Sequence, residues 1–380
     1  MKLAIVAGEA SGDLHASEVV RELRALDPSL TAFGIGGGGL RREGVEILHD
    51  IQELGIVGLF NVIRHLPMFR RIFREIVERI ERERPDALLL IDYPDFNLRL
   101  ARRMKALGIP VVYYISPQIW AWRKGRVREI VRNVERMLVI LPFEEELYRG
   151  HGLDVTYVGH PLVEQLEGVK RHGEYDPARV RIALMPGSRR MEVDNLLPAM
   201  AGAVAILRRR RHIDAYVIKA DTIERERIEM LLPPGSDIGI VESNGRQALA
   251  DSDLTLASSG TATLESAILG VPAVVMYRLS PLTYRLARRL VRLPHFSLVN
   301  IVAGKEVLPE LLQDQVNAEG VAAAAERLLD PEGHERMRAE LAEVRRRLGD
   351  PGASRRAAER IYTLVAAPRA GGVDPGVRTA

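Results

Sequence analysis

Apolar runs rich in Val and Ile alternate with segments of helical periodicity over most of the chain. A short, continuous apolar run predicts a strand buried on both faces, which is typical of parallel sheets. The predicted strands are Leu3–Ala7, Ala87–Ile91, Val111–Ile115, Met137–Leu141, Ile182–Met185, Ala215–Ile218, Leu254–Ala257 and Ala273–Tyr277.

The segments between these strands have the spacing of amphipathic helices. In Pro67–Arg84 the apolar positions repeat at intervals of three and four, which predicts one buried helix face. Those positions are Phe69, Ile72, Phe73, Ile76, Val77 and Ile80. Strands alternating with helices predict an α/β protein whose parallel sheets are covered on both sides.

The apolar periodicity lapses in GHPLVEQLEGVKRHGEYDPARVR, where Gly, Pro and charged residues dominate. We therefore expect two Rossmann-like domains, residues 1–165 and 166–349. We also expect a helix at about 350–366 to pack back on the first domain, and 367–380 to be a loose tail because it has little apolar content.

Composition excludes several classes of protein. The 380 residues include no cysteine, so disulfides, thiolate metal sites and cysteine nucleophiles are excluded. No run approaches the roughly 20 apolar residues of a membrane span, and the start lacks signal-peptide features, so we expect a cytoplasmic protein. The net charge is +3. Basic clusters such as FRRIFREIVERIERER suit anionic ligands or a membrane surface, but their interleaved Glu also fits a solvated helix face. No nucleic-acid-binding module is recognisable.

Two loops in the second half have the chemistry to bind phosphate. In each, a strand is followed by small residues and then by a helix, whose N-terminus attracts anions. The first loop contains Gly187, Ser188 and Arg189, and the second is Ser258–Thr261. Glu265 follows one turn into the next helix and could accept hydrogen bonds from ribose. The alternative is that both loops are ordinary helix caps.

The strand-end loops of the first half are acidic. They are GEASGD, IDYPDFN and ISPQIWAWRKGR, and they carry Glu9, Asp13, Asp92 and Asp95. A carboxylate in a cleft can act as a general base on a hydroxyl group. Asp13 could instead cap its helix, and Asp95 could form an Asx turn. His15 is a second candidate base or an exposed helix residue.

One half is thus suited to an anionic nucleotide and the other to a hydroxyl-bearing partner. A nucleotide-sugar glycosyltransferase with two facing Rossmann-like domains requires this division.

An ordered set of motifs resembles the lipid-A-disaccharide synthase family from about Lys2 to about Gln313. The motifs are GEASGD, DYPDFN, SPQIWAW, VGHP, PGSR, SSGTATLE and LVNIVAGKEVLPELLQ. The resemblance implies a GT-B fold and an inverting glycosyltransferase of lipid A (lipopolysaccharide) biosynthesis in a Gram-negative bacterium. It implies that UDP-2,3-diacylglucosamine and 2,3-diacylglucosamine 1-phosphate (lipid X) give a β(1→6) lipid A disaccharide 1-phosphate and UDP. Neither a metal nor a cofactor is expected.

The resemblance also implies roles for particular residues. Asp95 would be the general base, with Asp13 and Glu9 at the reaction centre. Implied acceptor-side residues are Ser11, Gly12, His15, Asp92, Asn97, Gln118 and Trp120. Implied UDP-binding residues are Gly187, Ser188, Arg189, Ser259, Gly260, Thr261, Ala262, Thr263, Glu265 and Asn300. In this family the motif around Asn300 usually reads LPN, whereas this chain has LVN, so Val299 departs from the family pattern.

The substrates of this family carry acyl chains, and each buried methylene contributes about 0.8 kcal/mol to membrane binding. We therefore expect peripheral association with the cytoplasmic face of the inner membrane. GIVGLFNVIRHLPMF, flanked by Arg64, Arg70 and Arg71, is the candidate contact, unless it packs in the core. Its apolar side would be Leu59, Phe60, Val62, Ile63 and Leu66. A homodimer is compatible with the sequence.

Three other functions remain open at this stage. A UDP-N-acetylglucosamine 2-epimerase would keep the UDP loops and need no acceptor. A peptidoglycan-type transferase typically has a GGTGGH-like first loop, which GEASGD is not. A sugar-binding protein is generally exported.

Overall fold

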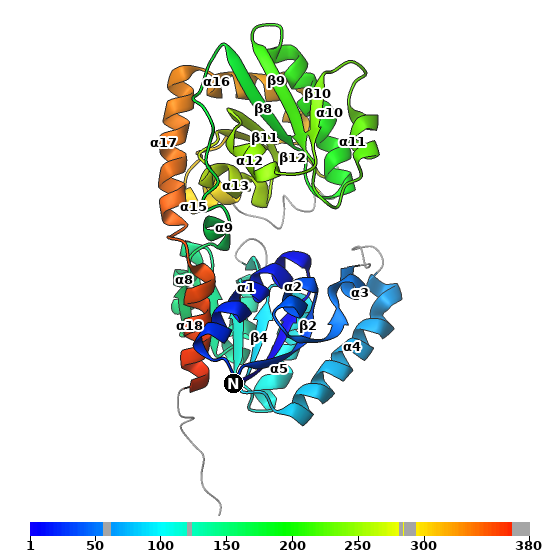
Figure 1. The fold of residues 1–380 in the computed structure, drawn as a ribbon, viewed down its shortest axis with the longest axis vertical. Helices are drawn as coiled ribbons and strands as arrows, with labels where there is room; N and C mark the ends of the chain where they lie inside the picture. Colours follow the sequence, from blue (N-terminus) through cyan, green and yellow to red (C-terminus); the bar gives the residue numbers. More distant parts are fainter. Residues whose placement is uncertain (56–61, 120–123, 281–283, 285–293, 367–380) are drawn as a thin grey trace, which may run out of the picture. The chain divides into compact units, whose positions relative to one another are not determined.

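The computed structural model describes residues 1–55, 62–119, 124–280, 284 and 294–366. The chain divides into two compact units (Figure 1). Unit 1 consists of Met1–Pro161 with Gly352–Ala380, and unit 2 consists of Leu162–Pro351.

Unit 1 is built on a seven-stranded parallel sheet in the order β3-β2-β1-β4-β5-β6-β7. The strands are β1 Lys2–Ala7, β2 Thr31–Gly36, β3 Glu46–Asp50, β4 Ala87–Ile91, β5 Val111–Tyr114, β6 Arg136–Val139 and β7 Asp154–Tyr157. Every residue of β4 and β5 is buried, as the continuous apolar runs predict. The order changes direction beside β1, so the ends of β1 and β4 form the switch point at which such sheets bind ligands.

Helices cover this sheet and place the loops at its carboxyl edge. They are α1 Ala10–Leu26, α2 Gly38–Arg42, α3 Ile51–Gly55, α4 Val62–Glu83, α5 Pro94–Ala106, the 3₁₀ turn η1 Lys124–Arg126, α7 Val127–Asn133, α8 Pro142–Arg149 and α18 Ala353–Ala366. α18 packs against α1 (Figure 1). Its Arg356 Nε donates to the carbonyl of Val158 at 2.8 Å.

Helix α4 carries the predicted apolar stripe but begins before its proline. Pro67 lies inside the helix. Ile72, Ile76 and Ile80 are completely buried, and Phe69 packs against the same core. The stripe therefore docks α4 on the sheet, as its spacing predicts.

Unit 2 has a six-stranded parallel sheet in the order β10-β9-β8-β11-β12-β13. Its strands are β8 Arg179–Met185, β9 His212–Ile218, β10 Ile238–Val241, β11 Leu254–Ser258, β12 Ala273–Tyr277 and β13 Glu310–Leu312. Its helices are α10 Arg190–Leu207, α11 Arg225–Leu231, α12 Gly245–Ala250, α13 Thr261–Ile268, α15 Leu298–Ala303, the 3₁₀ turn η2 Gln313–Gln315, α16 Ala318–Leu328 and α17 Pro331–Arg347. A short helix, α9 Pro161–Gln165, begins at the junction of the two units. Helix α10 packs against α16, and α13 packs against α17.

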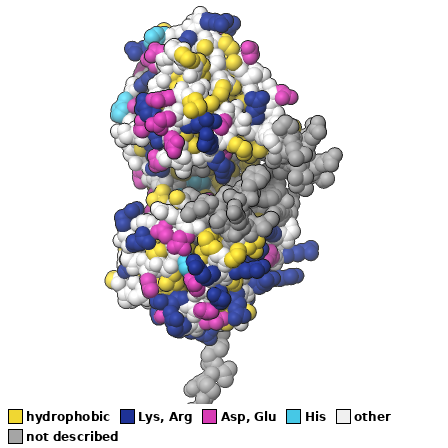
Figure 2. Space-filling model, turned by 90° about the vertical axis from the view of Figure 1, so that its right-hand side faces the viewer, with side chains coloured by type: hydrophobic (Ala, Val, Ile, Leu, Met, Phe, Trp, Pro, Cys, Tyr) yellow, Lys and Arg dark blue, Asp and Glu magenta, His cyan; other side chains and the backbone are white. Residues whose placement is uncertain are grey.

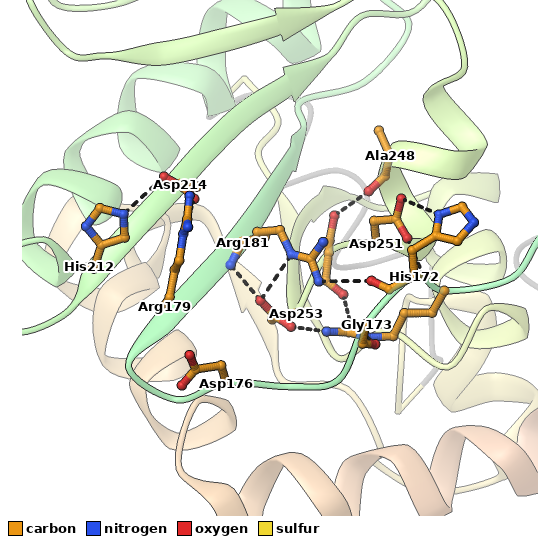
Figure 3. A network of polar contacts seen from close by, with 12 residues as sticks. His172, Gly173, Asp176, Arg179, Arg181, His212, Asp214, Ala248, Asp251 and Asp253 are labelled. Atoms are coloured by element: carbon orange, nitrogen blue, oxygen red, sulfur yellow. Dashed lines mark hydrogen bonds and ion pairs between the residues drawn. The ribbon is translucent and has the colours of Figure 1, made fainter.

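The segment that enters unit 2 is fastened to the amino-terminal ends of β8 and β11 by a polar network (Figure 3). The buried carboxylate of Asp253 accepts hydrogen bonds from the Arg181 amide at 2.6 Å and from the Arg171 guanidinium. The His172 amide donates to Asp251 at 2.6 Å. The network stabilises unit 2. Because it lies at the amino-terminal ends of the strands, it does not occupy the carboxyl-terminal edge of the sheet, where ligands bind in folds of this kind.

In the part of the chain that the structure describes, no helix is both long and apolar enough to span a membrane. On the face that Figure 2 shows, Lys and Arg side chains are interspersed with Asp and Glu.

Candidate active site

The turn between β4 and α5 has a strained backbone. Asp92 and Tyr93 are consecutive non-glycine residues in the left-handed region, with φ of 44° and 49°. The carbonyl of Asp92 accepts a hydrogen bond from Asn97 Nδ2 at 2.7 Å and another from the Tyr113 hydroxyl at 2.5 Å. Such a conformation costs of order 1–3 kcal/mol per residue and persists only where the surroundings fix it. Completely buried Asn97 supplies that constraint.

The first loop of the chain packs directly beneath this turn. A Cβ at Gly8 would lie 2.3 Å from Cγ of the Tyr93 ring, so only glycine leaves room for the ring. At Gly12 a Cβ would meet Ile91 at 3.5 Å, which is an ordinary contact. The glycine of GEASGD that matters for packing is therefore the first one.

Asp92 lies in an electronegative environment. Burial raises its pKa to about 6, and the Glu9 carboxylate adds to this shift, while the Tyr93 amide and His15 oppose it. The pKa of the Tyr93 hydroxyl is raised by burial, by Glu9 and by Asp95. Glu9 thus affects both Asp92 and Tyr93 at the carboxyl ends of β1 and β4.

Asp95 has different surroundings although it is three residues away. Its side chain is 71% exposed, and its Oδ1 lies 2.6 Å from Nη2 of Arg126, which belongs to η1. Arg126 is the last residue of the ISPQIWAWRKGR loop, but the sequence did not predict its pairing with Asp95. Surface ion pairs of this kind contribute about 0–1 kcal/mol to stability.

Asp13 binds backbone amides of a neighbouring helix. The buried carboxylate accepts hydrogen bonds from Gly37 at 2.6 Å, Gly39 at 2.7 Å and Leu40 at 3.2 Å. These amides belong to the first turn of α2 and the residue before it. The sequence offered two roles for Asp13, catalysis or capping of its own helix, and the structure shows a third: it caps α2.

Two histidines flank the acidic residues. His15 Nδ1 is 3.7 Å from a carboxylate oxygen of Glu18. His160 is buried, and both burial and the charge of His15 lower its pKa to about 3. The VGHP motif contains His160, but the sequence did not predict its burial or its interaction with His15.

The other acceptor-side residues differ in accessibility. Ser11 is exposed in the first turn of α1, Gly12 and Asn97 are buried, and Gln118 is exposed. Trp120 lies outside the described residues.

In unit 2, the PGSR loop is occupied by a carboxylate of its own helix. Glu192 Oε2 accepts hydrogen bonds from the amides of Ser188 at 3.1 Å and Arg189 at 3.3 Å. Its Oε1 is 3.0 Å from Nη1 of Arg189, whose side chain is otherwise 82% exposed. Gly187 has φ 115°, and a Cβ there would meet Glu192 at 2.3 Å. The loop therefore has an anion-binding geometry that an internal anion fills.

Tyr277, at the end of β12, interacts electrostatically with the residues of the PGSR loop and with Glu192. Its pKa is raised by burial and by Glu192 and lowered by Arg189. The Thr222 hydroxyl donates to the Ser188 carbonyl at 2.6 Å and braces the loop from another strand end. Sequence reasoning missed both residues.

The SSGT loop precedes α13. Gly260 is its N-cap, and Thr261 is exposed in the first turn. The Ser259 hydroxyl donates to the Phe296 carbonyl at 3.2 Å. Thr263 is completely buried and donates to the Gly260 carbonyl at 2.8 Å, so its hydroxyl serves the loop. Ala262 is partly buried beside it.

Glu265 lies on the second turn of α13 and is 18% exposed. Burial raises its pKa, and the guanidinium of Arg246, 3.7 Å away, opposes that shift.

Asn300 is completely buried, and its side chain is fully hydrogen-bonded within the protein. Its Oδ1 accepts from the amides of Val307 and Leu308, both at 2.8 Å. Its Nδ2 donates to the Leu308 carbonyl at 2.8 Å and to Glu310 at 2.9 Å. The same carboxylate accepts from the Ser297 amide at 2.8 Å. Asn300 thus holds the loop that follows α15.

Within the described residues, no group of three or more His, Asp or Glu side chains is arranged to hold a metal ion.

Solved structures of low sequence identity have the same fold. UDP-N-acetylglucosamine 2-epimerase from Neisseria meningitidis, bound to UDP-GlcNAc, matches with a TM-score of 0.63 at 14% identity, over 96% of this chain and 100% of that one. MurG of Acinetobacter baumannii matches with a TM-score of 0.59 at 13% identity, over 95% and 99%. The fold is thus of the GT-B type, two Rossmann-like units with parallel sheets, and the predicted fold class is confirmed.

Sequence comparison identifies the family. A model described as Lipid-A-disaccharide synthetase matches residues 3–361. Lipid-A-disaccharide synthases of Anaeromyxobacter dehalogenans and Myxococcus xanthus are 45% and 44% identical to the chain, each over 96% of it and 97% of the relative. The chain belongs to the lipid-A-disaccharide synthase family, which makes it a glycosyltransferase of lipid A biosynthesis and confirms the resemblance.

Proposed function

We propose that the protein transfers 2,3-diacylglucosamine from its UDP derivative to the 6-hydroxyl of 2,3-diacylglucosamine 1-phosphate, with inversion at the anomeric carbon. The products are the β(1→6) lipid A disaccharide 1-phosphate and UDP. Family membership at 45% identity over 96% of the chain is the observation that carries this proposal.

Unit 2 binds the UDP part of the donor in this proposal. The diphosphate binds at the PGSR and SSGT loops, where Arg189 is exposed and α13 presents its N-terminus. Glu265 accepts hydrogen bonds from the ribose. Asn300 has its hydrogen bonds satisfied internally, so its role is to hold the neighbouring loop in position.

Unit 1 binds the acceptor and takes up its proton. The acceptor oxygen attacks the anomeric carbon, the bond to UDP breaks with its electron pair, and a carboxylate of the β4–α5 turn receives the proton. The resemblance assigns this step to Asp95, with Glu9 nearby. Asp13 acts through α2, whose first turn it holds in place.

The acyl chains of both substrates require the enzyme to work at a membrane surface, and we place it at the cytoplasmic face of the inner membrane. Of the candidate contact segment, residues 56–61 lie outside the described residues, and Met68 packs against the core of unit 1. Met68→Glu would disturb that core, so we propose Phe60→Glu as the test. We expect it to lower recovery with anionic phospholipid vesicles and to leave the melting temperature unchanged; normal vesicle recovery would contradict the contact.

The decisive experiment measures UDP release from UDP-2,3-diacylglucosamine with and without lipid X. Transfer predicts release that depends on lipid X, together with a disaccharide whose new anomeric proton has the β configuration by NMR. Release that ignores lipid X, or an α linkage, would overturn the proposal. Incubation with UDP-GlcNAc alone tests the epimerase alternative, and a changed configuration at C2 would support it.

A further inference from the structure

The side-chain carboxylate of Glu265 has no hydrogen-bond donor among the described residues, although the side chain is only 18% exposed. A largely buried carboxylate without hydrogen bonds costs free energy unless water or a ligand supplies the donors. In the function proposed above, the donors are the ribose hydroxyls of UDP. The carboxylate accepts from both hydroxyls only in its ionised form, so the site also needs a positive charge nearby.

That charge comes from Arg246, the second residue of α12. Its Nε lies 3.7 Å from Oε1 of Glu265, which is longer than a hydrogen bond, so the contact is electrostatic and leaves the carboxylate oxygens available to a ligand. Helices α12, α15 and α17 and strands β11 and β12 pack against α13. Burial raises the pKa of Glu265, and of the described charged side chains on these elements only Arg246 opposes that shift.

The guanidinium of Arg246 is held on its other side by α9. Nη1 donates to the backbone carbonyl of Gln165 at 3.2 Å, and Nη2 donates to the side-chain carbonyl of the same residue at 3.0 Å. The backbone before Arg246 is closely packed as well, since a Cβ at Gly245 would lie 2.9 Å from Ile218 at the end of β9. Two hydrogen bonds fix the plane of a guanidinium, and they therefore fix the edge that faces Glu265.

We propose that Arg246 is a positioning residue for nucleotide recognition, which holds the Glu265 carboxylate ready to accept hydrogen bonds from the ribose hydroxyls. This inference rests on the proposed function, in which Glu265 binds the ribose of UDP. Arg246 acts through Glu265 and needs no contact of its own with the nucleotide. Because its guanidinium is anchored on Gln165, α9 takes part in organising the ribose site.

The test compares the binding of UDP and of 2′,3′-dideoxy-UDP to the full chain by titration calorimetry. The two nucleotides share the base and the diphosphate, so the ratio of their dissociation constants reports on the ribose hydroxyls and cancels the ionisation of the phosphates. Hydrogen bonds to a charged group are strong, so we expect wild type to prefer UDP by about 10- to 100-fold. Glu265→Ala should abolish this preference.

Arg246→Gln should reduce the preference about five- to tenfold and leave the affinity for dideoxy-UDP nearly unchanged. On acidification, the variant should lose its preference at a higher pH than wild type. The charge that opposes the effect of burial is gone, so the carboxylate of Glu265 takes up a proton sooner. Arg246→Lys keeps the charge and should restore most of the preference.

The matched control is Gln247→Ala. The side-chain amide of Gln247 donates to the Lys170 carbonyl at 2.7 Å, so it joins α12 to the segment that enters unit 2, as Arg246 does. Gln247 makes no contact with Glu265 within the described residues, so its variant should keep the wild-type preference for UDP.

Two results would overturn the role of Arg246. One is an Arg246→Gln protein that keeps the wild-type preference over the whole pH range. The other is equal loss of affinity for both nucleotides, because that loss indicates a structural role only. A preference that survives in Glu265→Ala would instead overturn the ribose contact of the proposed function, and the role of Arg246 with it.

Discussion

The carboxylate of Asp13 is surrounded by backbone amides. Three N–H groups at the start of α2 donate to it, and the side chain is buried. Each buried amide left unpaired costs about 1–3 kcal/mol. We expect Asp13→Ala to lower the free energy of unfolding of unit 1 by roughly 2–5 kcal/mol, measured by urea denaturation. Glu9→Gln, at an exposed position beside it, should change that free energy by less than about 0.5 kcal/mol. Equal effects of the two substitutions would contradict a capping role for Asp13.

Gly8 and Gly12 form a matched pair within GEASGD. An alanine at Gly8 must displace the Tyr93 ring, because its Cβ would lie 2.3 Å from the ring, whereas at Gly12 the nearest contact is 3.5 Å. We expect Gly8→Ala to cost about 1–3 kcal/mol of stability and to reduce turnover by disturbing the Asp92–Tyr93 turn. Gly12→Ala, inside a helix, should leave the melting temperature within a few degrees or raise it. Calorimetry and the UDP-release assay on both variants check this. A Gly8→Ala enzyme with wild-type turnover would show that the turn does not need this close approach.

At the scale of elements, the strands with continuous apolar runs could be predicted from the sequence, and all eight appear in the two sheets. Strands β2, β3, β7, β10 and β13 were missed. In β2, TAFGIG, two glycines weaken the apolar signal; at Gly34 a Cβ would lie 1.8 Å from the Ile5 carbonyl oxygen. Strands β3, β7, β10 and β13 are at sheet edges, and each has at most one buried residue, so none of them has a continuous buried apolar run. These segments form strands because of contacts with neighbouring strands, which the local sequence pattern does not show.

The candidate site, like the strands, could be predicted from the sequence only in part. The loops follow strand ends, so their positions could be predicted from the sequence. Contacts between distant residues could not, which is why the amides that bind Asp13 and the pairing of Asp95 with Arg126 were missed. Glu192 is an exception, because its spacing of three from the N-cap Arg189 is that of a capping box and could have been recognised.

Glu192 supports a prediction about the PGSR loop. Its carboxylate accepts from the amides of Ser188 and Arg189 and pairs with the Arg189 guanidinium, so it competes with any phosphate at the same donors. We expect Glu192→Gln to tighten UDP binding by about fivefold, corresponding to about 1 kcal/mol of relieved repulsion. Titration calorimetry with UDP measures this, and Arg189→Gln should weaken binding in the same assay. Weaker binding by Glu192→Gln would mean that Glu192 organises the loop for phosphate.

At the scale of the whole molecule, the buried His160 links the stability of unit 1 to pH. Burial and His15 lower its pKa from 6.5 to about 3 in the folded state. Between these values the unfolded chain binds a proton that the folded chain does not, so the stability contributed by His160 is present above pH 6.5 and is lost as pH falls toward 3. The loss is up to about 1.4 kcal/mol per pH unit. Asp92 acts in the opposite direction below about pH 6, because its folded pKa is raised.

Comparing His160→Gln with wild type isolates the histidine, because the contribution of Asp92 is common to both. We expect the free energy of unfolding to fall more steeply with acidification in wild type than in the variant between pH 6.5 and 5. Denaturant titrations at a series of pH values, followed by tryptophan fluorescence, measure this slope. Parallel curves for the two proteins would mean that His160 is equally protonated in the folded and unfolded chains.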